Sequence, residues 1–158
     1  MTEQPLILTL KLDKDSQAFF EAQRKKYFPP ERNWLEAHLM LFHQLPNDHH
    51  TRHFLNGFIH ELFVLQVTGL MNLGAGVAYR VESPALSALQ RELSRHFAAM
   101  LIPQDRQGFR PHITIMNKTT PEEARELITD LSVNFESFAI TAIGFDLWTS
   151  LGGPWRHE

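Results

Sequence analysis

The predicted order of elements repeats within the chain, and this repeat limits the possible folds more than any other feature. The first half predicts a strand, a helix, a strand, a helix and a hairpin, and the second half repeats this series from its own helix onward. Matching residues keep a steady offset, since His112 lies 74 residues after His38 and Trp155 lies 76 after Tyr79. We interpret the pattern as an internal duplication.

Alternating apolar residues, caps and turn residues predict the individual elements. Strands are expected at residues 5–12, 37–45, 64–72, 77–82, 109–118 and 138–148, with a last strand beginning at 154. Helices are expected after Asp13 or Asp15, from about Thr51 with an apolar stripe reaching Ile59 and Leu62, from Ser83-Pro84 with a stripe reaching Met100, and from Thr120-Pro121. The predicted class is therefore α+β, a bilobal pseudo-twofold duplication with antiparallel-rich sheets, helices on the outer faces and a central cleft. Residues 1–158 are expected to form one domain of two lobes.

Composition excludes several kinds of site. The 158 residues include no cysteine, which excludes disulfides, thiolate metal ligands and a cysteine nucleophile. The net charge is −3 and no basic stripe is present, so long nucleic acid is not an expected partner, whereas a small nucleotide or an RNA end is. The N-terminal residues resemble no signal peptide and no apolar run is long enough for a membrane span, so a cytoplasmic location is expected.

Two predicted strands each carry a histidine followed by alternating apolar residues. These strands read Ala-His-Leu-Met-Leu at 37–41 and Pro-His-Ile-Thr-Ile at 111–115. Because successive side chains of a strand point to opposite faces, the leucines and isoleucines share the core face, and His38 and His112 point away from the core. A pseudo-twofold axis between the halves would place both histidines on facing walls of one cleft.

A pair of histidines supports acid–base chemistry on phosphodiesters. An imidazole titrates near pH ~6.5, so one histidine can accept a proton from the attacking water while the other donates one to the leaving oxygen. Thr114 shares the face of His112 and can donate a hydrogen bond to a phosphoryl oxygen. This chemistry requires no metal or other cofactor.

At these two segments the chain resembles the 2H phosphoesterase superfamily, also called the 2′-5′ RNA ligase-like or cyclic phosphodiesterase superfamily. The His-Ile-Thr-Ile stretch at 112–115 resembles its His-x-Thr/Ser-x motif, and the His-Leu-Met-Leu stretch at 38–41 resembles the second copy, so the copies span 37–42 and 111–116. The resemblance implies a phosphoric diester hydrolase acting on 2′,3′-cyclic phosphates or 2′-5′ linkages of RNA or nucleotides. It also implies that His38 and His112 are catalytic and that Thr114 contacts the phosphate.

The first motif copy departs from this pattern at Met40, where the family has Thr or Ser. A thioether donates no hydrogen bond, and losing a bond to a charged group removes roughly 1.5–3 kcal/mol. The alternative function is therefore a nucleotide or RNA-end binding module with weak or no turnover.

Further residues are candidates by position, and each has a simpler structural explanation. Packing or edge positions account equally for the possible cleft-lining residues, which are Met40, Phe42, Tyr79, Arg110, Met116 and Lys118. His49 and His53 have helical spacing that suits a metal, but no third ligand lies at supporting spacing except Asp48. We therefore expect a surface cluster there rather than a metal site.

Overall fold

The computed structural model describes residues 4–58 and 62–158. The strands are β1 Leu6–Leu12, β2 Leu39–Leu45, β3 Phe63–Asn72, β4 Val77–Glu82, β5 His112–Met116, β6 Phe138–Ser150 and β7 Trp155–His157. The α-helices are α1 Lys14–Tyr27, α2 His49–Gly57, α3 Pro84–His96, α4 Pro103–Arg106 and α5 Pro121–Ser132. Two 3₁₀ turns lie at Pro30–Arg32 and Ala98–Met100.

The strands form one antiparallel sheet that closes into a ring. The order is β1-β2-β5-β4-β3-β6-β7, and an additional pairing of β1 with β6 closes the ring, so that β7 lies outside it, paired with β6. The pairing between β2 and β5, called the β2–β5 seam below, is short, because the two strands pair only at Leu39 and Ile113. Both residues are fully buried. The two motif-bearing strands are therefore neighbours in the ring.

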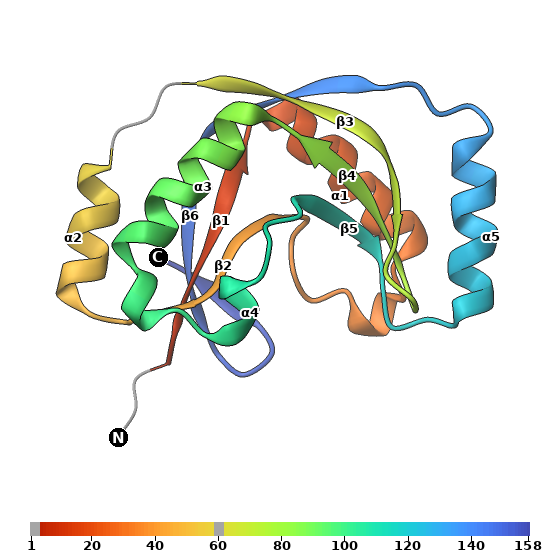
Figure 1. The fold of residues 1–158 in the computed structure, drawn as a ribbon. Helices are drawn as coiled ribbons and strands as arrows, with labels where there is room; N and C mark the ends of the chain where they lie inside the picture. The colour runs from red at the N-terminus through yellow and green to blue at the C-terminus, as the bar shows by residue number, and fades with distance from the viewer. Residues whose placement is uncertain (1–3, 59–61) are drawn as a thin grey trace.

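The first and third helices each cover strands from the other half of the chain (Figure 1). Helix α1 packs on β5, and its Phe20 lies 5.7 Å from the ring of Tyr79 on β4. At the other end of the molecule α2 and α3 lie side by side, and Phe97, which follows α3, contacts Phe42 on β2. The two lobes thus share one sheet and exchange their helices.

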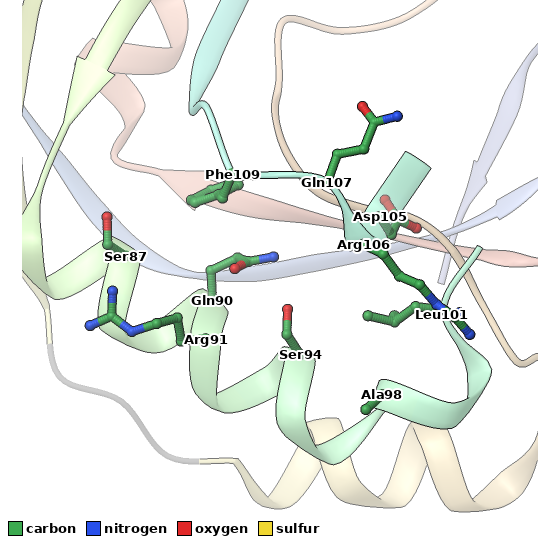
Figure 2. A pocket seen from close by; sticks show the side chains of 11 residues that line it. Ser87, Gln90, Arg91, Ser94, Ala98, Leu101, Asp105, Arg106, Gln107 and Phe109 are labelled. Atoms are coloured by element: carbon green, nitrogen blue, oxygen red, sulfur yellow. The ribbon is translucent and has the colours of Figure 1, made fainter. Parts of the chain in front are cut away.

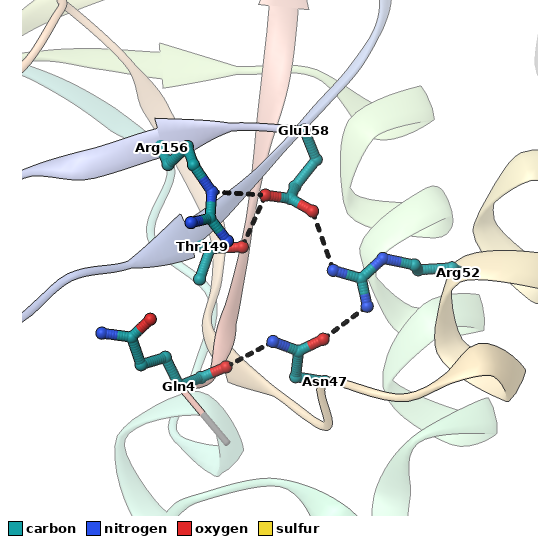
Figure 3. A network of polar contacts seen from close by, with 6 residues as sticks. All are labelled: Gln4, Asn47, Arg52, Thr149, Arg156 and Glu158. Carbon is teal, nitrogen blue, oxygen red and sulfur yellow. Dashed lines mark hydrogen bonds and ion pairs between the residues drawn. The ribbon is translucent and has the colours of Figure 1, made fainter.

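A polar network fastens α2 to the last strands (Figure 3). Glu158 accepts hydrogen bonds from Arg52 at 2.8 Å and from Thr149 at 2.6 Å, and Arg52 also bonds Asn47. The Asn47 amide donates in turn to the carbonyl of Gln4, just before β1. These contacts lower the pKa of Glu158 to about 2, chiefly through the hydrogen bonds from Thr149 and Arg52.

The predicted α+β class and the antiparallel sheet are confirmed, with local differences at element ends. The Ser83 and Thr120 side chains cap α3 and α5 as expected, accepting from the N–H groups of Leu86 and Glu123. The predicted stripe to Leu62 is wrong, because α2 ends at Gly57 and Leu62 is exposed. Ile59, which belonged to that stripe, lies outside the described residues.

Two further elements are shorter than predicted. Strand β5 begins at His112 rather than at residue 109, since Pro111 has no N–H to donate to a ladder. Helix α3 ends at His96, and the continuation toward Met100 is a 3₁₀ turn. In the described part of the chain no helix is long and apolar enough to cross a membrane.

Candidate active site

His38 and His112 occupy one face of the β2–β5 seam. Leu39 pairs with Ile113 in the antiparallel register, so moving one residue along each strand places His38 opposite Thr114 and Met40 opposite His112. Residues directly opposite each other share a face, which here is the face away from the buried Leu39. The two histidines are diagonal neighbours across the seam.

The two imidazoles are held in the same way. Nδ1 of His38 lies 2.8 Å from the carbonyl oxygen of Glu36, and Nδ1 of His112 lies 2.7 Å from that of Arg110. A carbonyl oxygen only accepts hydrogen bonds, so each Nδ1 carries a hydrogen and donates it. In the neutral ring the free lone pair is then on Nε2, and neither carbonyl is hydrogen-bonded to that nitrogen. Each carbonyl belongs to the residue two positions before its histidine.

The pKa of His38 is lowered to about 4. Burial of the ring is the largest cause, the bond to Glu36 opposes it, and the charges of Arg24, His112 and His43 add to the lowering. The side chain still keeps partial exposure, because the ring lies at the bottom of a concave surface. At neutral pH His38 is therefore uncharged and can accept a proton at Nε2.

Helix α1 holds the backbone of both motif strands. Glu21 accepts a 2.6 Å bond from the N–H of Ala37, and Gln17 donates to the Ala37 carbonyl at 2.8 Å. One turn further, Arg24 donates to the Thr114 carbonyl at 3.0 Å. Arg24 is only 3% exposed and lies over the Phe28 ring, and burial lowers the pKa of its guanidinium. This helix face keeps the two strands in place where their own ladder is shortest.

Sequence reasoning missed this role of α1. Arg24 follows Phe20 by four residues on the buried face of the helix, and both are buried. A charged residue at a core position is rare unless it is paired, so the spacing was a usable signal. The sequence could not identify the partner of Arg24, because that partner is the backbone carbonyl of Thr114, 90 positions away.

Strand bulges direct two of the predicted cleft-lining residues into the core instead of the cleft. The β1–β2 register shifts between the pairs Leu8–Phe42 and Thr9–Met40, and Leu41 and Phe42 are both buried. Phe42 therefore packs in the core against Phe97 rather than lining the cleft. The bulge adds a residue and breaks the alternation on which the prediction rested.

The second motif strand has a bulge at the matching place. The β4–β5 register shifts between Val77–Met116 and Ala78–Thr114, and Ile115 and Met116 are both buried. The prediction that Met116 lines the cleft is therefore also wrong. In each copy the bulge falls three to four residues after the histidine, so the duplication extends to backbone irregularities.

Tyr79 does not line the site either. It is 5% exposed, its hydroxyl donates to Gln23 on α1, and aromatic rings of Phe19, Phe20 and Phe138 surround it. Alternation places the next residue, Arg80, on the opposite face, where it pairs with His112. Arg80 is exposed and takes the position beside the second histidine.

The other predicted candidates lie near the seam. Met40 is half-buried and pairs with Thr9 of β1, on the face of His38. Arg110 is exposed and lines a cavity of about 440 Å³ together with Arg80. Lys118 follows the end of β5 in a left-handed conformation, with Nζ 5.8 Å from the ring centre of Trp34.

Aromatic rings surround the first histidine. Trp155 of β7 lies 4.7 Å from the His38 ring, and Trp148 of β6 lies 5.9 Å from Trp155. A cavity of about 340 Å³ beside them is lined in part by His38, Trp148 and Asp146. Sequence reasoning named Trp155 as the repeat counterpart of Tyr79 and did not single out Trp148.

The histidines of α2 form a separate surface group. His49 and His53 stack at 5.7 Å on α2, and the Asp48 carboxylate caps that helix by accepting from Thr51. Among residues 4–58 and 62–158, no three His, Cys, Asp or Glu side chains gather closely enough to hold a metal ion.

A model of the 2′-5′ RNA ligase superfamily matches residues 12–154. No curated protein matches the chain.

Solved structures share the fold at low identity. Escherichia coli LigT complexed with 3′-AMP is 20% identical with a TM-score of 0.62, covering 99% of this chain and 94% of LigT. A phosphoesterase is 21% identical at 0.62, covering 98% of this chain and 94% of its own. The protein TT0787 of Thermus thermophilus is 16% identical at 0.66, covering 97% and 94%. The chain belongs to the 2′-5′ RNA ligase superfamily, the 2H phosphoesterases.

Proposed function

We propose that this protein is a phosphoric diester hydrolase that acts on RNA or nucleotide ends, at a 2′,3′-cyclic phosphate or a 2′-5′ linkage. Membership of the family supports phosphodiesterase-type chemistry in general. The specific proposal rests on the matched setting of the two histidines, which lie across one seam with each Nδ1 bonded to a backbone carbonyl.

The low pKa of His38 supports its role as the base, and the role of acid then falls to His112. His38, whose pKa is about 4, is neutral at pH 7, so its Nε2 takes the proton from the attacking water. The water oxygen bonds to phosphorus, and the ribose O2′ or O3′ leaves with a proton from Nε2 of protonated His112. The product is a phosphomonoester, and proton exchange with solvent returns both rings to their starting states.

Thr114 and Arg80 complete the proposed phosphate site. Thr114 lies opposite His38, and Arg80 lies opposite His112, on the same face. A hydroxyl and a guanidinium both stabilise the charge that builds up on the phosphoryl oxygens. Relatives of this fold support a nucleotide ligand, since E. coli LigT has been solved with 3′-AMP, with NADP⁺ and with ATP.

Hydrolysis of a 2′,3′-cyclic nucleotide and of a 2′-5′ linked dinucleotide in the presence of a chelator tests this function. We expect turnover by the wild type, and a loss of about 10²–10⁴-fold in both His38→Ala and His112→Ala. His53→Ala, on the separate surface group, is the matched control and should retain full activity. Wild-type rates in both motif variants would refute the mechanism.

A second function is favoured by Met40. It lies opposite His112, at the position that mirrors Thr114, and offers no donor. The alternative is a protein that binds a nucleotide or RNA end without efficient turnover. Binding of 3′-AMP by a wild-type protein that hydrolyses neither substrate, together with a gain of turnover in Met40→Thr, would select this alternative.

A further inference from the structure

A pocket lies between α3 and the segment that joins α4 to β5 (Figure 2). It has a volume of about 650 Å³ and shares Ser87 and Phe109 with the 440 Å³ cavity that holds Arg80 and Arg110. The two cavities therefore adjoin, and together they are defined here as the α3 groove. Its second cavity is lined by Arg80, the cross-strand neighbour of His112.

The α3 groove contains an amide without a protein partner, on a residue that is otherwise largely buried. Gln90 is 7% exposed, and within residues 4–58 and 62–158 its side chain forms no hydrogen bond. Figure 2 shows its amide extending from α3 into the space below Phe109. The Gln90 amide atoms are not themselves buried, so they face the open cavity, where a ligand or water can bond to them.

The cations of the groove are also unpaired. Arg91 of α3 and Arg106 of α4 line the pocket, and neither forms an ion pair in the described part of the chain. Two acids line the groove. Asp105 is turned away, since its side chain is 2% exposed and accepts bonds from the backbone of His43 and Gln44. Glu82 is exposed in the second cavity, where Arg80 and Arg110 outnumber it. The groove therefore favours an anion.

We propose that the α3 groove binds the nucleotide on the 5′ side of the reacting ribose, so that the substrate is an oligonucleotide end rather than a mononucleotide. This proposal rests on the proposed function. Arg91 and Arg106 suit the phosphodiester, Gln90 suits a base edge or ribose hydroxyl, and the Phe109 ring suits a stacked base. The volume lies within the usual range of nucleotide-sized sites, roughly 300–1,000 Å³.

A comparison of two substrates tests the groove directly. One is a cyclic mononucleotide and the other an RNA trinucleotide ending in the same 2′,3′-cyclic phosphate. We expect the double variant Arg91→Gln/Arg106→Gln, and Gln90→Leu by itself, to raise KM for the trinucleotide about tenfold while kcat/KM for the mononucleotide changes less than twofold. Arg125→Gln, on the exposed face of α5, is the control and should change neither. Equal effects on both substrates, or none on the trinucleotide, would overturn the groove proposal.

A binding measurement separates failure of the groove from failure of the catalytic proposal. Fluorescence anisotropy of a labelled trinucleotide is measured with His112→Ala, with and without the groove substitutions, in variants whose Tm matches the parent. We expect the groove substitutions to weaken Kd about tenfold and to reduce the slope of log Kd against log salt by about 0.7 for each phosphate that is no longer neutralised. Groove-dependent binding without turnover in the wild type would keep the groove and reject the hydrolase. Turnover with groove-independent binding would do the reverse.

Discussion

The two halves of the candidate site share a framework but differ in their surroundings. Both histidines are anchored through Nδ1 to the carbonyl two residues earlier, and both strands bulge after the motif. The half around His38 is aromatic, with Trp155 against the ring, whereas His112 has the exposed Arg80 as its cross-strand partner. Duplication has preserved the way in which the backbone holds each histidine. The residues around the two rings have diverged, so that one ring is suited to accept a proton and the other has phosphate-binding groups beside it.

The test of this asymmetry with the largest expected effect varies the leaving group of the substrate. With a ribose leaving group we expect His38→Ala and His112→Ala to lose about 10²–10⁴-fold in kcat/KM. A p-nitrophenyl phosphodiester has a leaving group that needs no proton, so His112→Ala should recover most of its loss on that substrate. His38→Ala should not recover, because the water still needs a base. Recovery of activity in His38→Ala on this substrate would mean that His38 is the acid and His112 the base.

The next test concerns the residues that face the histidines, Thr114 and Met40. Removing the hydroxyl in Thr114→Val should lower kcat by about ten- to a hundredfold if its bond forms mainly in the transition state. Adding a hydroxyl in Met40→Thr should raise kcat by up to about tenfold. Steady-state kinetics with one cyclic nucleotide measures both, and Met40→Leu serves as the control without a donor. A loss of activity in Met40→Thr would show that the thioether itself is required.

Titration of His38 gives a third test. Its folded pKa of about 4 lies below the ordinary value of 6.5, so in this window the unfolded chain takes up the proton first as pH falls. The resulting contribution to stability is present above pH 6.5 and is lost as pH falls toward 4. We expect NMR to show His38 neutral at pH 5.5, and urea unfolding to show a smaller loss of stability between pH 6.5 and 4 in His38→Gln. In His112→Gln the pKa of His38 should rise, because His112 lowers it.

The smallest expected effect lies in the network around Glu158, on the His38 side (Figure 3). Glu158→Gln should lower the free energy of unfolding by about 1 kcal/mol, through weaker bonds to Arg52 and Thr149. The folded pKa of about 2 lies below the ordinary 4.5, so this stabilisation is present above pH 4.5 and lost as pH falls toward 2. Thermal unfolding measures the change, and kcat should stay at the wild-type value. A drop in kcat would link the network to the reaction centre.

Features that depend on neighbours along the chain were predictable from sequence. Alternation identified Leu39 and Ile113 as buried, and with them the opposite face of the histidines. Caps at Ser83 and Thr120 fixed two helix starts, because the bonds involved span three residues. The matching order of elements gave the duplication before any contact was known.

Features that depend on partners far along the chain were not predictable. Whether Phe42 faces core or cleft depends on a register shift against β1, which is set by the partner strand. The Arg24 bond to Thr114 and the aromatic rings around His38 need the folded ring of strands before they exist. The exchange of helices between lobes likewise follows from packing rather than from local propensity.

That exchange of helices has a consequence for assembly of the protein. Helix α1 belongs by sequence to the first half but packs on β5, and β1 pairs with β6 from the second half. A polypeptide cut between the two copies would leave each fragment with an unpaired sheet edge and an uncovered apolar face, so neither fragment would fold in isolation. The interlocking also ties the walls of the site to each other, because elements of both halves hold each wall.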